Sequence, residues 1–339
     1  MKLDYWIYFL IALVSFLLTA FFRSYAVKKN ILDVPNERSS HYIPTPRGGG
    51  VAIVITFTIL LIYAYLVHAV PLSYFISFSL VGLFVATIGF MDDKKNLPAR
   101  WRLLGHFLAA IWGLFWIGGL PNLEVFGIEF QLGVVGNVLA VIYLVWMLNL
   151  YNFMDGIDGL ASLEAICVCA GMCIVYLLAG AHELILLPLS LSMAVLGFLY
   201  WNYPPAKIFM GDAGSSFLGI LLGLLSLQAA WYNTIFLWCW LILLGVFIVD
   251  ATVTLCRRLF WGAKLYEAHR SHAYQFASRR FGKHLPVSLG VCFINVFWLL
   301  PLSLSVALSL IDGAIALIIG YIPLILLALF FNAGRSEGR

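Results

Sequence analysis

The sequence predicts an all-α polytopic integral membrane protein that forms a single domain over residues 1–339. Of its residues, 63% are hydrophobic and only 11% are charged, which excludes a soluble protein of two or three domains. The apolar residues form continuous runs and do not alternate with polar residues, which excludes a membrane-spanning β-barrel. Many of these runs approach the roughly 20 residues that a helix needs to cross a bilayer.

We expect about eleven transmembrane helices, because unpaired backbone groups are too costly in hydrocarbon for other structures. Connecting segments such as 180–182 and 311–312 are very short, so the helices they join must be antiparallel neighbours. The first run is expected to be retained, because it is long, lacks a small-x-small cleavage site and precedes a basic segment. The expected spans are 4–22, 50–69, 72–90, 103–120, 133–150, 160–179, 183–201, 214–230, 233–252, 287–309 and 312–331.

The positions of the basic residues predict the orientation of these spans. All of the 20 Lys and Arg residues except Lys2 fall in segments that lie on one face if eleven helices alternate. Basic residues of short loops stay on the cytoplasmic side, so we expect a periplasmic amino terminus and a cytoplasmic carboxyl terminus. The expected cytoplasmic loops with polar motifs are 23–49, 91–102, 150–160, 202–214 and 253–286. The net charge of +4 thus reflects membrane topology, and no nucleic-acid partner is expected.

Acidic and amide side chains gather at these predicted cytoplasmic ends. Asp92 and Asp93 end the third run, and two adjacent carboxylates need a divalent cation or nearby Lys and Arg. The alternative is a solvated helix end neutralised by Lys94 and Lys95. Arg102 lies in the same loop and is a candidate substrate-binding residue.

A second motif ends the fifth run with Asn152, Asp155 and Asp158 at every third position. A helical or 3₁₀ course places all three on one side. The order of ligands is not that of an EF-hand. Helix capping by Asp158 is the structural alternative, and it leaves the other two residues unexplained.

A third motif runs from Asn202 through two prolines and Phe209 to Asp212. The prolines prevent a helix, and Gly211 and Gly214 allow close approach of the backbone to a ligand. The amino terminus of the following helix attracts phosphate, although Asp212 as a simple cap is the alternative.

Two further motifs supply cationic and planar donors. The longest cytoplasmic loop contains His269, Arg270 and His272, which suit phosphate or sugar oxygens, and a zinc site is the weaker alternative. Residues 41–50 combine prolines, Arg47 and three glycines, which suits an anion-binding loop or a plain interfacial turn. Asp250, inside the ninth run, is expected either to pair with Arg257 or to act in the site.

This inventory indicates a phosphorylated, metal-bound substrate handled at the membrane face, with one soluble and one lipidic partner. Phosphoryl transfer needs mainly positioning and neutralisation of charge, which these residue types provide. The alternative is a transporter of an anionic solute. Transporters place ionisable groups near the bilayer midplane and often show inverted repeats, and the sequence shows neither feature.

Through these motifs, over nearly the whole chain, the sequence resembles the polyprenyl-phosphate N-acetylhexosamine-1-phosphate transferase family. The resemblance implies transfer of a sugar 1-phosphate from a UDP-sugar to undecaprenyl phosphate, giving undecaprenyl-diphospho-sugar and UMP. It also implies Mg²⁺, with Mn²⁺ as an alternative, in the cytoplasmic membrane of a bacterium. A homodimer is compatible with the family. The product would initiate O-antigen or another cell-envelope polysaccharide.

The resemblance also implies roles for individual residues. Asp92 and Asp93 match the acidic motif that binds Mg²⁺ or activates the lipid phosphate, and Asp212 matches a metal-ligand aspartate. The segment from His269 to His272 departs from the family's His-x-His-His form, resembles the O-antigen-initiating subgroup and argues against the peptidoglycan enzyme. The nucleotide-sugar side of the cleft is matched by Asn152, Asp155 and Asp158, with Asp158 and Asn202 near uracil and Phe209 stacking on it.

Overall fold

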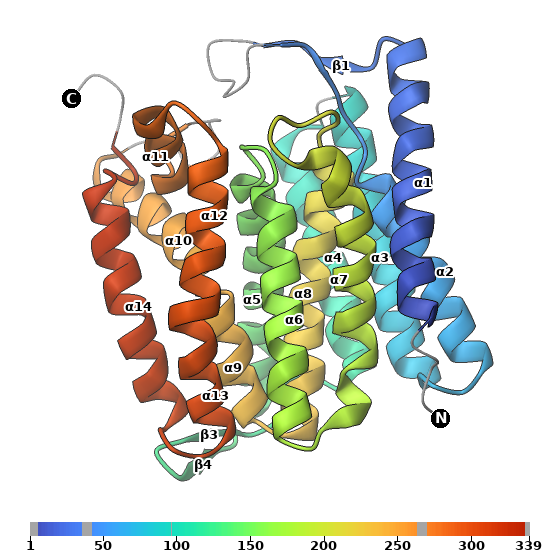
Figure 1. Cartoon of the computed structure of the whole chain (residues 1–339). Coiled ribbons are helices and arrows are strands. Elements are labelled where there is room, and N and C mark those ends of the chain that lie inside the picture. Colours follow the sequence, from blue (N-terminus) through green and yellow to red (C-terminus); the bar gives the residue numbers. More distant parts are fainter. Residues whose placement is uncertain (1–5, 36–42, 96, 263–269, 336–339) are drawn as a thin grey trace.

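The computed structural model describes residues 6–35, 43–95, 97–262 and 270–335, and these form a bundle of long helices (Figure 1). In chain order the helices are α1 (Trp6–Lys28), α2 (Val51–Leu66), α3 (Leu72–Lys95), α4 (Ala99–Ile117), α5 (Gly133–Met154), α6 (Leu160–Leu178), α7 (Leu186–Asn202), α8 (Asp212–Tyr232), α9 (Ile235–Leu243), α10 (Gly245–Phe260), α11 (Ala273–Phe281), α12 (Leu285–Ile294), α13 (Leu300–Ala307) and α14 (Gly313–Phe330). A 3₁₀ turn (His182–Leu184) precedes α7, and a π-helical segment (Asn295–Leu299) joins α12 to α13.

Two short antiparallel hairpins accompany the helices. Strand β1 (Leu32–Asp33) pairs with β2 (Thr45–Pro46), with Leu32 opposite Pro46. Strand β3 (Leu123–Val125) pairs with β4 (Ile128–Phe130), with Glu124 opposite Glu129. Figure 1 places β1 and α11 at one end of the bundle and the β3–β4 hairpin at the other. The all-α fold class is confirmed, since these strands are only two or three residues long.

The expected eleven apolar runs all form helix in the described residues, but fewer of them qualify as spans. Eight helical stretches are long and apolar enough to cross a membrane, or nine if α9 and α10 count together. Helix α2 has only 16 residues, because the chain leaves it at Val67 and His68 takes a left-handed φ of 58°. Helix α4 carries Arg100 and Arg102 in its first turn, which lowers its hydropathy. The prediction of eleven spans was therefore too high by these criteria.

The ninth run is not the single straight helix that we expected. It breaks at Leu244 into α9 and α10, which are bent by 68° relative to each other. The break turns α10 toward the end of the bundle that carries α11 and β1 (Figure 1). This bend brings Asp250, in α10, to the polar end of the molecule.

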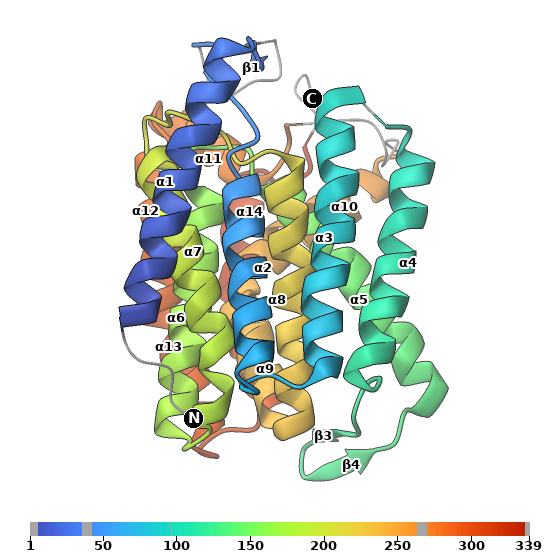
Figure 2. The same ribbon diagram turned by 90° about the vertical axis from the view of Figure 1, so that its right-hand side faces the viewer.

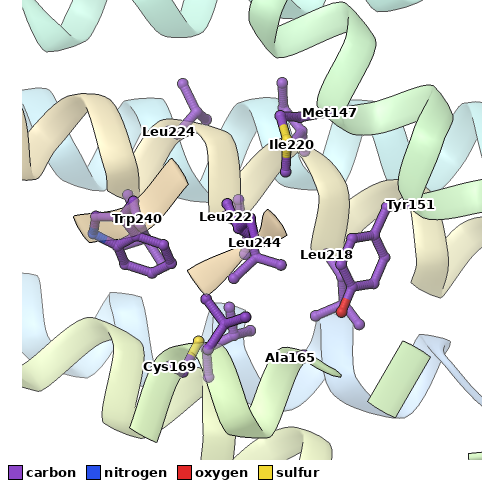
Figure 3. Close-up of a cluster of buried hydrophobic side chains, with 14 of the residues drawn as sticks. Met147, Tyr151, Ala165, Cys169, Leu218, Ile220, Leu222, Leu224, Trp240 and Leu244 are labelled. Atoms are coloured by element: carbon purple, nitrogen blue, oxygen red, sulfur yellow. The ribbon is translucent and has the colours of Figure 1, made fainter. Parts of the chain in front are cut away.

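Helix α8 is the centre of the bundle, and nearly all of its residues are buried. It packs between α3 and α5, with α2 and α4 also against it (Figure 2). Figure 3 shows how Leu218 and Leu222 of α8 meet Tyr151 of α5, Cys169 of α6 and Trp240 of α9 in this core. Because α8 contacts so many neighbours, its first residue, Asp212, is held at a fixed point among the ends of the other helices.

Candidate active site

The loop before α2 lies against the loop before α8, although about 160 residues of chain separate them. The N–H of Phe209 donates to Pro46 O (2.8 Å), and the N–H of Gly49 donates to Phe209 O (2.9 Å). A Cβ atom on Gly50 would lie 2.5 Å from the Cα of Gly214, so the backbones of α2 and α8 touch at their first turns. This close approach joins the glycine-rich motif containing Arg47 to the motif containing Asp212.

Asp92 is occupied by contacts within the protein. The N–H of Leu97 donates to Asp92 Oδ1 (2.7 Å), and Arg102 forms an ion pair with Asp92 Oδ2. The Asp92 side chain is only 8% exposed. The same Arg102 guanidinium lies 4.0 Å from Asp212 Oδ2. Asp92 therefore holds Arg102 between itself and Asp212.

Asp93 occupies a different position from its neighbour and faces the start of α8. The N–H of Ala213 approaches Asp93 Oδ2 at 3.5 Å, and Arg47 lies 3.9 Å from Asp93 Oδ1. Gly211 has a φ of +76°, and a Cβ there would lie 2.8 Å from Asp93 Oδ2. A side chain at 211 would thus strain the turn and press on the carboxylate, which explains glycine at this position.

Asn152 and Asp155 bring the end of α5 into the same cluster. The Asn152 amide donates to Ser215 Oγ (3.0 Å) in the first turn of α8. Burial, together with the nearby charges of Asp212, Asp93 and Asp158, raises the pKa of Asp155 well above its usual value. The sequence motifs around Asp93, Asp155 and Asp212 are therefore neighbours in space.

The donor chemistry of this cluster fits a divalent cation. Among the described residues, no three His, Cys, Asp or Glu side chains converge in a complete protein-made metal site. Mg²⁺, however, is usually held by one or two carboxylates together with substrate phosphates and water. Within the described residues, the three carboxylates of Asp92, Asp93 and Asp212 have ion-pair contacts with two cations, Arg47 and Arg102, so the group has a surplus of negative charge for a metal.

Asp158 lies in the turn between α5 and α6, and Asn202, the last residue of α7, contacts this turn. Asp158 Oδ2 accepts the N–H of Ala206 (3.1 Å) and lies 3.2 Å from His284 Nδ1. Asn202 is 2% exposed. Its Oδ1 accepts from Gly159 N–H (3.1 Å) and its Nδ2 donates to Ile208 O (3.1 Å). Asn202 thus fastens this turn to the loop before α8.

Asp250 anchors the beginning of α11. Its carboxylate accepts the main-chain N–H groups of Ala273 (2.9 Å) and Tyr274 (3.0 Å), and Oδ1 lies 3.3 Å from His272 Nδ1. The expected pairing of Asp250 with Arg257 is wrong, because Arg257 donates to Ala333 O (2.7 Å) at the far side of the helix end. The reason is that Asp250 faces the amino terminus of α11, where main-chain N–H groups stabilise a carboxylate.

The remaining predicted residues lie around this cluster. His272 is buried against Phe153, whose carbonyl accepts the Tyr274 hydroxyl (2.9 Å). Arg270 and Phe209 are half-buried. The predicted residue His269 and the first two positions of the 41–50 motif lie outside the described residues.

Sequence reasoning missed three polar residues that contact the predicted ones. Ser215 binds Asn152, while His284 and Ser288 at the start of α12 bind Asp158. His284 stands directly before a Leu-Pro helix start, a place where a capping side chain is common, but nothing in the sequence indicates its partner.

The comparisons with known proteins agree with this arrangement. The model of the family described as glycosyl transferase family 4 matches residues 75–230. The chain is 31% identical to the probable undecaprenyl-phosphate N-acetylglucosaminyl 1-phosphate transferase of Bacillus subtilis (strain 168), over 78% of this chain and 75% of the relative. It is 31% identical to the undecaprenyl-phosphate alpha-N-acetylglucosaminyl 1-phosphate transferase of Thermotoga maritima, over 86% of this chain and 88% of the relative.

The name of a third relative gives a different transferred group. The chain is 29% identical to the phospho-N-acetylmuramoyl-pentapeptide-transferase of Lactococcus lactis subsp. cremoris (strain SK11), over 77% of this chain and 82% of the relative. The likeness to all three proteins extends over most of each chain, and the family model's range of 75–230 includes Asp93, Asp155 and Asp212. The chain therefore belongs to glycosyl transferase family 4.

Proposed function

We propose that this protein transfers an N-acetylhexosamine 1-phosphate from a UDP-sugar to undecaprenyl phosphate, giving undecaprenyl-diphospho-sugar and UMP. The observation that carries the proposal is the cluster of Asp93, Asp155 and Asp212 with Arg47 and Arg102 at one end of a membrane bundle. The names of two relatives point to N-acetylglucosamine as the first sugar to test. We further propose that the product initiates O-antigen synthesis, because the segment around His272 resembles that of the O-antigen-initiating subgroup.

The residues divide between the two substrates. Asn152, Asp155 and Asp158 line the nucleotide-sugar side, while Arg47 and Arg102 neutralise phosphate oxygens. Asp93 and Asp212 would hold Mg²⁺. When bound there, the ion supplies positive charge that stabilises the transferring phosphoryl group.

The lipid substrate has an apolar cavity beside this cluster. The cavity has a volume of about 260 Å³ and is lined by side chains of α10, α11, α12 and α14, including Val249, Ala277, Val291 and Leu324. Asp250 and Tyr274 also line the cavity. Tyr274 donates its main-chain N–H to Asp250 and its hydroxyl to Phe153 O, near the end of α5. We propose that the part of the polyprenyl chain next to its phosphate enters here.

In the reaction, an oxygen of the lipid phosphate forms a bond to the sugar-side phosphorus, and the bond from that phosphorus to the UMP oxygen breaks. A phosphate monoester has its second pKa near ~6, so it is already largely ionised at neutral pH. The attack therefore needs no strong protein base. The task of the chain is to hold both phosphates in line and to offset their charge.

The proposed sidedness follows from the basic residues. Basic residues stand at the helix ends around the cluster: Lys94 ends α3, Arg102 lies in the first turn of α4 and Lys207 precedes α8. Loops rich in Lys and Arg stay in the cytoplasm. A transporter of anionic solutes is not favoured, because the polar cluster lies at the helix ends and not near their middle.

The test is to incubate membranes with undecaprenyl phosphate, Mg²⁺ and each of several labelled UDP-sugars, and to measure label that passes into organic solvent. We expect Asp212→Asn to lower UMP release on the order of 100-fold or more, because it removes charge that faces the reacting phosphates. Chelation of divalent cations is expected to have the same effect on the wild type. Glu129→Gln, in the hairpin at the opposite end, is the control. Wild-type turnover by Asp212→Asn would reject the assignment.

A further inference from the structure

The first turn of α12 holds Asp158 at several points. His284 Nδ1 lies 3.2 Å from Asp158 Oδ2 and 3.3 Å from the main-chain N of Asp158. Four residues later, on the same face of the helix, Ser288 Oγ donates to Asp158 O (2.9 Å). The side chains of His284 and Asp158 are only 14% and 12% exposed, so their contact is well shielded from water.

The Nδ1 atom of His284 can hydrogen-bond either to the carboxylate or to the main-chain N–H of Asp158, depending on whether Nδ1 is protonated. A protonated Nδ1 donates to the carboxylate of Asp158, and an unprotonated Nδ1 accepts the main-chain N–H. In both forms His284 connects the turn between α5 and α6 to α12. The carboxylate is also fixed by Ala206 N–H (3.1 Å), which leaves it little freedom to rotate.

The fold itself does not depend on this contact. The Asn202 amide closes the same turn through Gly159 N–H and Ser162 Oγ, both at 3.1 Å. Helix α12 is held by the buried side chains of Val287 and Val291. What His284 adds is the orientation of the Asp158 carboxylate and of the turn that also carries Asp155.

We propose that His284 is a positioning residue for the nucleotide-sugar side of the active site. It acts through Asp158, which lies in the same turn as Asp155. The proposal rests on the proposed function, because that function assigns the turn to the UDP-sugar.

The experiment measures steady-state kinetics of purified full-length protein for each substrate separately. We expect His284→Ala to raise the KM for the UDP-sugar about tenfold, which corresponds to about 1.4 kcal/mol. The KM for undecaprenyl phosphate and the melting temperature should stay near wild-type values. His284→Asn should recover most of the loss, because its amide offers both a donor and an acceptor near the place of Nδ1. His182→Ala, at an exposed position at the other end of the bundle, is the matched control.

Ser288→Ala distinguishes the effect of the contact to the Asp158 carboxylate from that of the contact to the Asp158 main chain. It removes a contact to Asp158 O alone, so we expect a smaller rise in the UDP-sugar KM than in His284→Ala. If His284→Ala does not accumulate as folded protein, His284→Gln takes its place and must show the same selective rise.

Three results would overturn the proposal: an unchanged UDP-sugar KM in His284→Ala or its replacement His284→Gln, an equal rise of both KM values, or no recovery in His284→Asn. These results are distinct from failure of the proposed function. If the proposed function is wrong, the wild type itself will transfer none of the sugars.

Discussion

The adjacent carboxylates Asp92 and Asp93 should respond to the same substitution in opposite ways. Asp92 is 8% exposed and is paired with Arg102, and its other oxygen accepts the Leu97 N–H. Asn at this position keeps the shape and one acceptor but leaves the guanidinium without its charged partner. Hydrogen bonds to charged groups contribute about 1.5–3 kcal/mol each, so we expect Asp92→Asn to destabilise the protein by about 1–3 kcal/mol.

For Asp93 we expect the opposite result, with little loss of stability and a large loss of activity. Its carboxylate faces Asp212, lies 3.9 Å from Arg47 and receives main-chain hydrogen bonds from the start of α8, of which the one from Ala213 is long at 3.5 Å. Asp93→Asn removes repulsion within the cluster, so we expect a melting temperature at or above that of the wild type. UMP release should nevertheless be lost, because the variant has one carboxylate fewer for the divalent cation.

The assay is thermal unfolding of the detergent-solubilised protein followed by intrinsic fluorescence, with UMP release measured on the same samples. For a chain of this size, the loss in Asp92→Asn corresponds to a fall in melting temperature on the order of 1–4 °C. Combining Asp92→Asn with Arg102→Gln should cost less than the sum of the two single changes, because both remove the same ion pair. If Asp92→Asn melts like the wild type and releases no UMP, Asp92 takes part in the chemistry and does not merely hold Arg102.

Two further predictions concern buried carboxyl groups. Glu164 is wholly buried and accepts from the Asn295 amide (2.5 Å), and Glu164→Gln should keep the melting temperature within a few degrees because its amide can donate to Asn295 Oδ1. A marked fall in Glu164→Gln, as large as in Glu164→Ala, would contradict this. Asp155→Asn should raise the melting temperature of the substrate-free protein at neutral pH, because burial and the charge of Asp212 raise the pKa of Asp155 in the folded state. A raised carboxyl pKa weakens folding as pH rises from the ordinary value toward the folded one, so the advantage should shrink in acid, as melting at several pH values will show.

Composition and run length were enough to predict a membrane helix bundle. Long apolar runs have one stable form in lipid, since each helix satisfies its own backbone hydrogen bonds. The number of spans was less certain from sequence. The short α2 and the arginines of α4 show that hydropathy runs and usable span lengths differ at helix ends.

The sequence by itself also predicted where a site would lie, because acidic and amide residues at the ends of apolar helices are costly without partners. Only the tertiary structure decided how those residues pair. Asp92 and Asp93 are neighbours in sequence, yet one binds Arg102 and the other faces Asp212, because successive residues of a helix point about 100° apart. The partner of Asp250 and the role of His284 depend on the bend before α10 and on the packing of α12 against α6. Such long-range contacts are set by how helices meet in space, which local sequence does not encode.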